Sequence, residues 1–206
     1  MTRPAMPPNQ HQIRSEQTRQ HLLDTAVSLM QAKGHGQFSI HELARAAGVT
    51  AGAVQHHFGS KALLMLQVLT HLIGQLGSDS DFWPSPDWPL QRRADHFVRE
   101  AWARLYGQPR FAVAWSAYLA ARDDAEMVAH IIEQRAELAA HLHHHMALSF
   151  PEMCRGPHAA ARMQFVLSTL RGIGLLAPFA EPSAIPPQLQ ELSRYLQSFN
   201  DPETSS

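Results

Sequence analysis

The segment from residue 39 to residue 61 constrains the fold most, because it carries the signals of two short helices joined by a tight turn. Ser39 and Glu42 have the spacing of a capping box, in which each side chain accepts a hydrogen bond from a backbone amide at the helix start. Gly48 follows the first helix and supplies the backbone freedom that a sharp turn needs. Thr50 then stands where it can cap a second helix. The segment therefore predicts a helix-turn-helix.

The second helix of this unit is expected from about Ala51 to Phe58, and its outer face is informative. Only Val54 and Phe58, four residues apart, are placed to face inward. The outward positions are small or hydrogen-bonding and nearly uncharged: Ala51, Ala53, Gln55, His56 and His57. Such a face fits the major groove of DNA, where base edges are read. An ordinary helical hairpin is the alternative, but caps, turn glycine, helix lengths and exposed face together favour the helix-turn-helix.

A wider pattern, over residues 15–75, resembles the N-terminal domain of the TetR family of bacterial transcriptional regulators. It comprises an amphipathic helix ending at Lys33, the run Ile-x-x-Leu-Ala-x-x-Ala-Gly-Val from Ile40, and a Ser-Lys-x-x-Leu run from Ser60. Each piece is weak alone, and the combined pattern is specific. One position departs, because Gln55 stands where the family usually has a tyrosine that contacts phosphate. Glutamine can still hydrogen-bond phosphate or adenine, so the kind of contact at this position stays open.

The resemblance implies a set of DNA contacts on and beside the second helix: Thr50, Ala51, Gly52, Ala53, Gln55, His56, His57 and Lys61. In this interpretation the alanine methyl groups pack on thymine methyl groups, and Gly52 lets the backbone approach DNA closely. Gln55 and His56 are the long polar side chains available for reading bases. His57 and Lys61 take positions that resemble the family's phosphate contacts, and Thr50 caps the helix and donates to a phosphate.

The charge of the chain is unevenly distributed, and this matters more than its net value of −1. Residues 1–77 hold six basic against three acidic side chains, whereas residues 78–206 hold eleven against fifteen. The first part is therefore the one that tolerates phosphate groups. Because its positive charge is modest, backbone amides at helix N-termini, particularly near Ser60, are expected to supply part of the anchoring.

Other bulk properties predict a cytoplasmic protein that is not an enzyme. The single cysteine, Cys154, excludes an intramolecular disulfide and suits a reducing compartment, and as a redox sensor it would need a partner from another molecule. No signal peptide or apolar segment of membrane-spanning length is visible. No glycine-rich phosphate loop, nucleophile elbow or His-Glu-x-x-His motif occurs, so we predict no catalytic residues and no cofactor.

Helical periodicity continues beyond residue 60 with no strand pattern, so the sequence predicts an all-α fold of about nine helices. We expect a flexible N-terminal arm over residues 1–14 and a flexible tail over residues 201–206. Between them, residues 15–60 form the helix-turn-helix DNA-binding domain. Residues 61–200 form a larger helical-bundle domain for ligand binding and dimerisation.

The resemblance implies that two copies pair through their last two helices and bind a palindromic DNA operator. The sequence offers two apolar sets for this pairing, which could instead complete the protomer core. They are Met163, Val166, Leu167, Leu170 and Ile173 with Gly172 and Gly174 in one helix, and Leu189, Leu192 and Leu196 in the other.

The resemblance also implies a small-molecule effector that releases a repressor from its operator. The candidate wall of its pocket is aromatic and apolar, which suits a largely apolar ligand: Trp102, Tyr106, Phe111, Trp115, Tyr118, Met127 and Ile131. An aromatic stripe at helical spacing is more often plain core, so both interpretations stay open.

A histidine cluster supports the main alternative, a metal-binding or metal-dependent helical protein. His141 and His145 share a helix face with Glu137, and His143 and His144 lie between them. Two histidines four residues apart can chelate a metal. A solvated histidine patch at a helix C-terminus explains the same residues, and fourteen histidines in the chain make chance clusters common. No Glu-x-x-His pair of the di-iron bundles occurs, so we predict no resident metal.

Overall fold

The computed structural model describes residues 10–33, 38–77, 79, 81–120, 123 and 125–200. Within these residues it holds nine α-helices and no strand, which confirms the all-α prediction. The α-helices are α1 (Gln10–Ala32), α2 (Ile40–Ala47), α3 (Ala51–Phe58), α4 (Lys61–Gly77), α5 (Leu90–Ala101), α6 (Pro109–Ala120), α7 (Ala125–Ser149), α8 (Ala159–Leu176) and α9 (Ile185–Gln197). No helix in the described ranges is long and apolar enough to cross a membrane.

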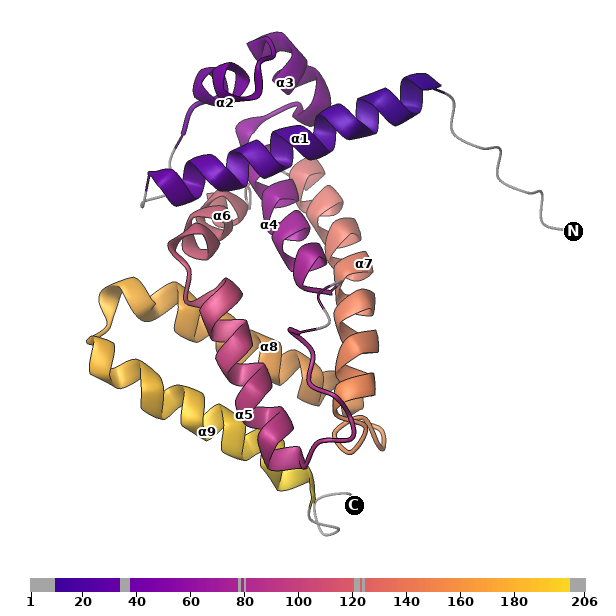
Figure 1. Ribbon diagram of the computed structural model, residues 1–206, viewed down its shortest axis with the longest axis vertical. Coiled ribbons are helices and arrows are strands. Elements are labelled where there is room, and N and C mark those ends of the chain that lie inside the picture. The colour runs from indigo at the N-terminus through magenta and orange to yellow at the C-terminus, as the bar shows by residue number, and fades with distance from the viewer. Residues whose placement is uncertain are drawn as a thin grey trace, which may run out of the picture.

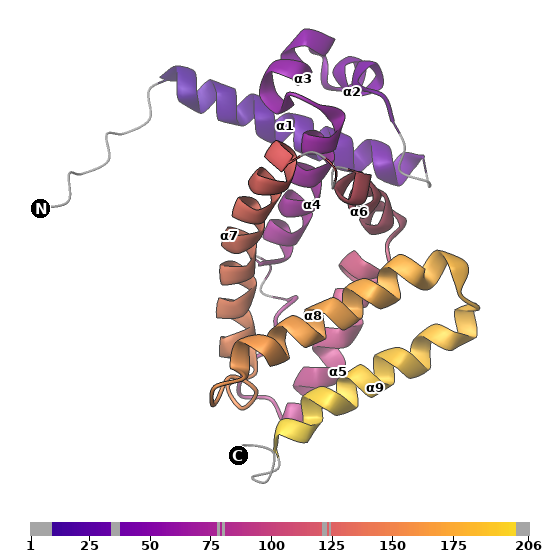
Figure 2. The same ribbon diagram turned by 180° about the vertical axis from the view of Figure 1, so that it is seen from behind.

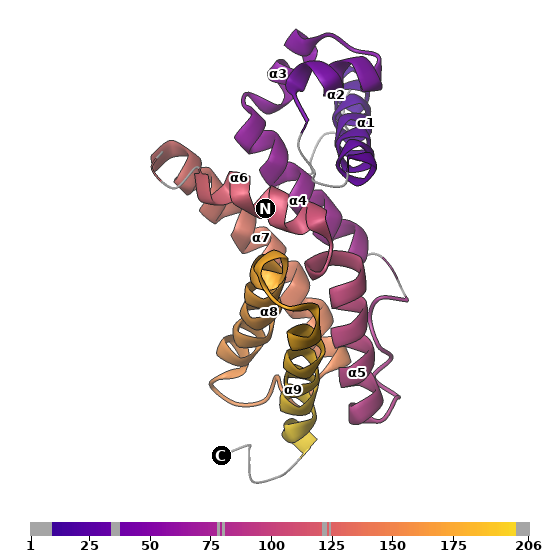
Figure 3. The ribbon, with the colours of Figure 1, turned by 90° about the vertical axis from the view of Figure 1, so that its left-hand side faces the viewer.

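The helices form a head and a body that α4 connects (Figure 1). Helices α1, α2 and α3 make the head at one end, and α4 runs from it into the body, where it packs against α6 and α7. At the other end α5 packs against α9, and α8 lies beside α9 (Figure 2). A side view shows α2 and α3 at the tip of the molecule, far from α8 and α9 (Figure 3). One hydrophobic core runs through both parts.

Two boundaries differ from the sequence prediction. Helix α1 begins at Gln10, so residues 10–14 are helical and do not belong to a flexible arm. The predicted helix after Leu90 is α-helical only to Ala101 and continues as a π-helical segment, Trp102–Tyr106. Shorter 3-10 segments follow α8 at Ala177–Phe179, precede α9 at Pro182–Ala184 and end the described chain at Ser198–Asn200. Residues 1–9 and the predicted tail 201–206 lie outside the described residues.

A buried arginine joins α5 to the segment between α7 and α8. The Arg93 side chain is only 6% exposed, and it donates to Glu152 at 2.6 Å and to the carbonyls of Ser149 at 2.7 Å and Trp88 at 2.9 Å. These bonds satisfy the guanidinium that burial removes from water. The hydrogen bond from Arg93 also lowers the pKa of Glu152, so the carboxylate stays charged.

Most of the apolar residues predicted for dimer pairing are buried inside the protomer, and for these the prediction is wrong; Leu189 is half-buried, and Gly172 has open space beside it. Met163, Val166, Leu167, Leu170 and Ile173 of α8 are at most 7% exposed, and Leu192 and Leu196 of α9 are at most 3%. Gly174 lies against the Tyr106 backbone, because a Cβ added there would sit 2.4 Å from the Tyr106 carbonyl oxygen. The alternative, completion of the protomer core, describes these residues.

Candidate nucleic-acid interface

The start and end of α2 have the predicted caps. The Ser39 hydroxyl accepts from the Glu42 amide at 3.1 Å, and the Glu42 carboxylate accepts from the Ser39 amide at 2.8 Å, which completes the capping box. Gly48 ends the helix with φ of 70°, in the left-handed region that favours glycine. Leu43 and Ala44 are buried, so α2 packs with one face on the head. This local geometry sets the angle at which the chain enters α3.

Helix α3 has the predicted orientation of its two faces. The Thr50 hydroxyl caps it by accepting from the Ala53 amide at 3.1 Å. Val54 and Phe58 are 0% and 3% exposed and anchor the helix to the core. The opposite side leaves Gly52, Gln55 and His56 exposed and Ala51, Ala53 and His57 half-buried. An eight-residue helix is thus presented at the tip of the molecule with small or polar side chains outward.

Three of the predicted contacts, Ala51, Gln55 and Lys61, line a groove of about 190 Å³ between α2, α3 and the start of α4. The other five do not line it: Thr50, Gly52, Ala53, His56 and His57. Gln55 and Lys61, both exposed, lie on this groove together with Ser60. Ser60 caps α4 by accepting from the Leu63 amide at 3.2 Å, so free amides of the first turn of α4 adjoin the same surface. The groove is lined by Ile40, His41, Ala51, Val54, Gln55, Phe58, Gly59, Ser60 and Lys61.

His41 is a candidate contact that the sequence interpretation did not include. It is exposed in the first turn of α2 and lines the groove beside Gln55 and Lys61. The available signal was its position in the first turn of α2, two residues after the N-cap and off the stripe formed by Ile40, Leu43 and Ala44. The approach of α2 to the start of α4 depends on tertiary packing, which local periodicity does not contain.

The acidic side chains of the head are each engaged by a neighbour. Glu16 pairs with Arg19 at 3.1 Å, and Asp24 accepts from His71 at 2.8 Å. Glu42 pairs with Lys33 at 2.6 Å, and hydrogen bonds from Lys33 and Ser39 lower the pKa of Glu42 to about 2. These carboxylates are partly compensated within the head.

Two exposed basic side chains of the head, unlike its carboxylates, have no oppositely charged partner among the described residues. Within the described residues, Arg45 of α2 and Lys61 of α4 have no carboxylate within ion-pair distance. Both are therefore available to phosphate groups without breaking an existing ion pair. The surplus of positive charge that the sequence places in the first third thus includes cations that are free to bind.

The head is tied to α4 by polar contacts. Arg19 donates to Gln67 at 3.1 Å. The His71 side chain is 9% exposed, donates through Nε2 to Asp24 at 2.8 Å and accepts at Nδ1 from Gln20 at 3.0 Å. Because α4 continues into the body, a movement of α4 would be transmitted to α1 and to the helices that α1 supports.

The predicted ligand wall is partly assembled in the body. Tyr106 and Phe111 are buried with ring centroids 4.9 Å apart, Trp115 stacks on Phe111 at 6.0 Å, and Trp102 lies half-buried beside the same core. Burial raises the pKa of Tyr106 to about 12, so its hydroxyl stays neutral. Ile131 packs instead against Leu66 of α4 in a separate small cluster. The side chains of Tyr118 and Met127 lie outside the described residues.

The histidine cluster near the end of α7 makes edge-to-face contacts among its rings, and one of its members stacks on a tryptophan. His141 and His145 have ring centroids 4.6 Å apart, and Trp83 stacks on His145 at 4.9 Å with 14° between the planes. Burial, followed by repulsion from His141 and His144, lowers the pKa of His145. In the described part of the chain no group of three or more His, Cys, Asp or Glu is arranged to hold a metal ion. The Glu137 side chain lies outside that part.

Comparison with known proteins matches the head most strongly. The sequence pattern of the family described as "Bacterial regulatory proteins, tetR family" matches residues 22–68. The HTH-type transcriptional regulator AcrR of Shigella flexneri is 43% identical over 54 residues, 26% of this chain and 25% of AcrR. SrpR of Pseudomonas putida is 40% identical over 38% of this chain and 35% of its own length. BetI of Rhizobium meliloti is 25% identical over 55% of this chain and 56% of its own length. The matches thus span between a quarter and just over half of these relatives.

Solved structures extend the likeness of fold to the body. A Rhodococcus sp. RHA1 protein superposes with a TM-score of 0.68 over 91% of this chain and 98% of its own, at 18% identity. Reduced NemR of E. coli superposes with a TM-score of 0.57 over 88% of this chain and 96% of its own, also at 18% identity. At such identities the likeness shows the fold alone. With the capped helix-turn-helix and the family pattern that covers it, residues 22–68 of this chain form a helix-turn-helix domain of the TetR family of bacterial regulatory proteins.

Proposed function

We propose that this chain is a sequence-specific DNA-binding transcriptional regulator of the cytoplasm, a repressor in which residues 15–60 bind a palindromic operator. The observation that carries the proposal is α3 itself, capped by Thr50 and presented at the tip of the head with small and polar residues outward. Gln55 and His56 read bases from this helix, and the alanine methyl groups at 51 and 53 pack on thymine methyl groups. His57, Lys61 and the amides at the start of α4 hold phosphates.

The test is selection of bound sites from random duplex DNA, followed by measurement of the affinity of the selected site against salt concentration. A palindrome with two half-sites one helical turn apart supports a dimeric operator-binding protein. Lys61→Ala should weaken binding and reduce the slope of log K against log salt by about one. Arg194→Ala, an equal loss of charge on the exposed surface of α9, is the matched control and should leave the slope unchanged. Enrichment of no sequence would contradict the proposal.

A dimer is proposed because a single helix-turn-helix contacts too little DNA for tight operator binding. An exposed apolar stripe on α8 and on the 3-10 segment Ala177–Phe179 that follows it supports the dimer. Phe165 is 52% exposed, Leu176 65% and Phe179 87%, and Gly172 between them leaves open space around its Cα. Monomeric surfaces rarely leave such large apolar side chains in one row. We therefore propose that the second copy of the chain packs against this exposed stripe, and not against the apolar residues of α8 that are buried in the protomer.

Sedimentation of charge variants tests the dimer. Leu176→Glu places a charge in the proposed interface and should shift the protein toward monomer at micromolar concentration. Ile132→Glu is the matched control, because Ile132 is 63% exposed on α7, away from this stripe. Equal behaviour of the two variants would argue against the assigned surface.

The effector is proposed to be a small, largely apolar molecule that enters the aromatic core of the body. Support comes from the connection between that core and the head. Phe111 and Trp115 lie on α6, α6 packs against α4, and α4 carries the head. A ligand that pushes α6 outward would therefore turn the head and lower operator affinity, provided that it binds the released state more tightly. Loss of operator binding on addition of an apolar compound, abolished in Trp115→Ala, would support this.

A further inference from the structure

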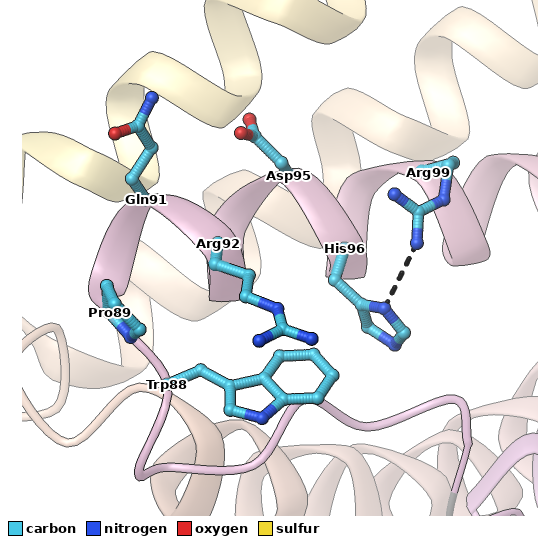
Figure 4. Close-up of a pocket in the computed structure, with 7 residues that line it drawn as sticks. All are labelled: Trp88, Pro89, Gln91, Arg92, Asp95, His96 and Arg99. Carbon is cyan, nitrogen blue, oxygen red and sulfur yellow. Dashed lines mark hydrogen bonds between the residues drawn. The ribbon is translucent and has the colours of Figure 1, made fainter.

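A second candidate ligand site lies on the exposed face of α5, remote from the head and from the aromatic core of the body. It is a groove of about 570 Å³ at the start of α5, lined by Trp88, Pro89, Gln91, Arg92, Asp95, His96 and Arg99 (Figure 4). It lies at the end of the body opposite α2 and α3. Neither the DNA-binding surface nor the proposed apolar effector uses these residues, so the inference goes beyond the proposed function.

Arg92 is the central group of this groove. Its guanidinium carbon lies 3.9 Å from the centroid of the Trp88 ring, so the indole supports one flat face of the guanidinium. The side chain is exposed, and among the described residues it makes no hydrogen bond and no ion pair. Stacking on Trp88 therefore restricts the orientation of the Arg92 guanidinium, and the N–H groups along its edge stay free to donate hydrogen bonds. Such an edge matches the two oxygens of a carboxylate.

His96 forms a fixed wall beside Arg92. Its Nδ1 faces Arg99 Nη2 at 3.1 Å, and a guanidinium can only donate, so Nδ1 is the acceptor. Nε2 lies 3.0 Å from the carbonyl oxygen of Asp81 and is therefore the donor. These two bonds define the neutral ring with its proton on Nε2. The ring edge also meets Trp88, with centroids 5.2 Å apart and planes at 84°. The wall is rigid, uncharged and aromatic.

The other charged side chains that line the groove already have partners. Arg99 pairs with Glu100 at 3.2 Å, which leaves Arg92 as the guanidinium without an anionic partner. Asp95 accepts from Ser193 at 2.6 Å and from Gln197 at 3.2 Å on α9. Figure 4 shows its carboxylate turned to the side of α5 opposite Trp88 and Arg92. An anion bound at the N–H edge of Arg92 is therefore closer to the positive guanidinium than to the negative Asp95 carboxylate.

We propose that this groove binds a small organic carboxylate with a flat apolar body. The Arg92 fork donates two parallel N–H bonds to the carboxylate, and the flat body packs against the His96 imidazole beside it. A carboxylate is the anion whose planar geometry matches the guanidinium edge, and the stacked indole has already restricted the rotation of that edge. Because the groove is open to solvent, binding is expected to be weak, on the order of millimolar for a small probe.

Titration of the full chain with sodium benzoate at constant ionic strength, followed by NMR shifts and calorimetry, tests the proposal without DNA. Benzoate should saturate, and benzyl alcohol, the uncharged analogue, should bind at least several-fold more weakly. Arg92→Gln should weaken benzoate about tenfold, and Arg92→Lys, which keeps the charge but loses the fork, should also weaken it. Asp95→Asn should strengthen it about two- to three-fold, because a negative rim charge is removed. Arg45→Gln, on exposed α2, is the control and should have no effect.

Three results would overturn the proposal: no saturation by benzoate, equal binding of benzoate and benzyl alcohol, or unchanged binding in Arg92→Gln. Tighter binding of inorganic phosphate than of benzoate would overturn the assigned ligand class, because phosphate has no flat apolar body. Arg92 is exposed, so its variants should unfold at the wild-type temperature, and that measurement separates loss of binding from loss of structure. Failure of operator binding leaves this test intact, since the two sites share no residue.

Discussion

Gly174 of α8 lies where the helix meets the π-helical segment, and its replacement by alanine gives a sharp test of this packing. A Cβ at position 174 would sit 2.4 Å from the Tyr106 carbonyl oxygen, 3.1 Å from the Tyr106 carbonyl carbon and 3.3 Å from Phe111 Cδ1. The two closest atoms belong to backbone, so a change of rotamer cannot relieve the contact. An ordinary contact requires α8 and the Trp102–Tyr106 segment to separate by about 1 Å.

The magnitude follows from two opposing effects. Overpacking of a core in this way costs about 1–3 kcal/mol. Alanine gains back about 0.5–1 kcal/mol over glycine inside a helix, because glycine loses more conformational freedom on folding. Gly174→Ala should therefore lower the free energy of unfolding by about 1 kcal/mol at the middle of these ranges and by at most about 2.5 kcal/mol. For a chain of this size each kcal/mol lowers the melting temperature by about 2–4 °C.

Gly74→Ala is the matched control, because position 74 is also inside a helix and an added Cβ there meets nothing within 4 Å. This variant should gain about 0.5–1 kcal/mol. Urea unfolding followed by circular dichroism measures both, with the slope m checked for equality. If Gly174→Ala proves as stable as Gly74→Ala, the close packing of α8 on the π-helical segment is not present in the protein.

Three further predictions concern single interactions. Replacing Arg93 by Met leaves Glu152 as an unpaired, half-buried carboxylate and should lower the free energy of unfolding by about 2 kcal/mol in urea; an unchanged value would mean that the pair does not form. Thr50→Ala removes the cap of α3 and should cost about 1 kcal/mol while weakening operator binding, whereas Thr50→Ser should restore both. The pKa of Glu42 is about 2 in the folded chain, below its ordinary value of 4.5. Its stabilising effect is therefore present above pH 4.5 and is lost as the pH falls toward 2. The melting-temperature difference between wild type and Glu42→Gln should shrink over that range, and a constant difference would contradict this.

The helix-turn-helix was predictable because its signals are local. A capping box needs only Ser39 and Glu42 at the right spacing, and a left-handed turn needs only Gly48. Val54 and Phe58 can reach the core only from one side of an eight-residue helix, which places the exposed side as well. In these cases the interacting groups are within about two helical turns of each other in the sequence. The local sequence pattern is therefore enough to predict the structure.

The body depended on contacts between distant segments. Helix α8 has apolar residues on more than one side, and periodicity cannot tell which side meets the Trp102–Tyr106 segment, α6 and α9 and which is left to solvent. The structure buries Val166 and Leu170 and exposes Phe165 and Leu176, the reverse of the pairing surface expected from sequence. The π-helical turn at Trp102–Tyr106 has no local sequence signal that we recognised.

The α5 groove illustrates the same division. The sequence shows Trp88 and Arg92 four residues apart, but not that the loop before α5 places the indole under the guanidinium. The tautomer of His96 depends on a carbonyl at residue 81, contributed by a segment outside the helix. Sequence alone therefore determined most of the α-helices, the caps of the helix-turn-helix and the exposed face of α3, because those depend on neighbouring residues. Tertiary structure decided which apolar faces are covered and which charges stay unpaired, because those depend on what packs against each helix.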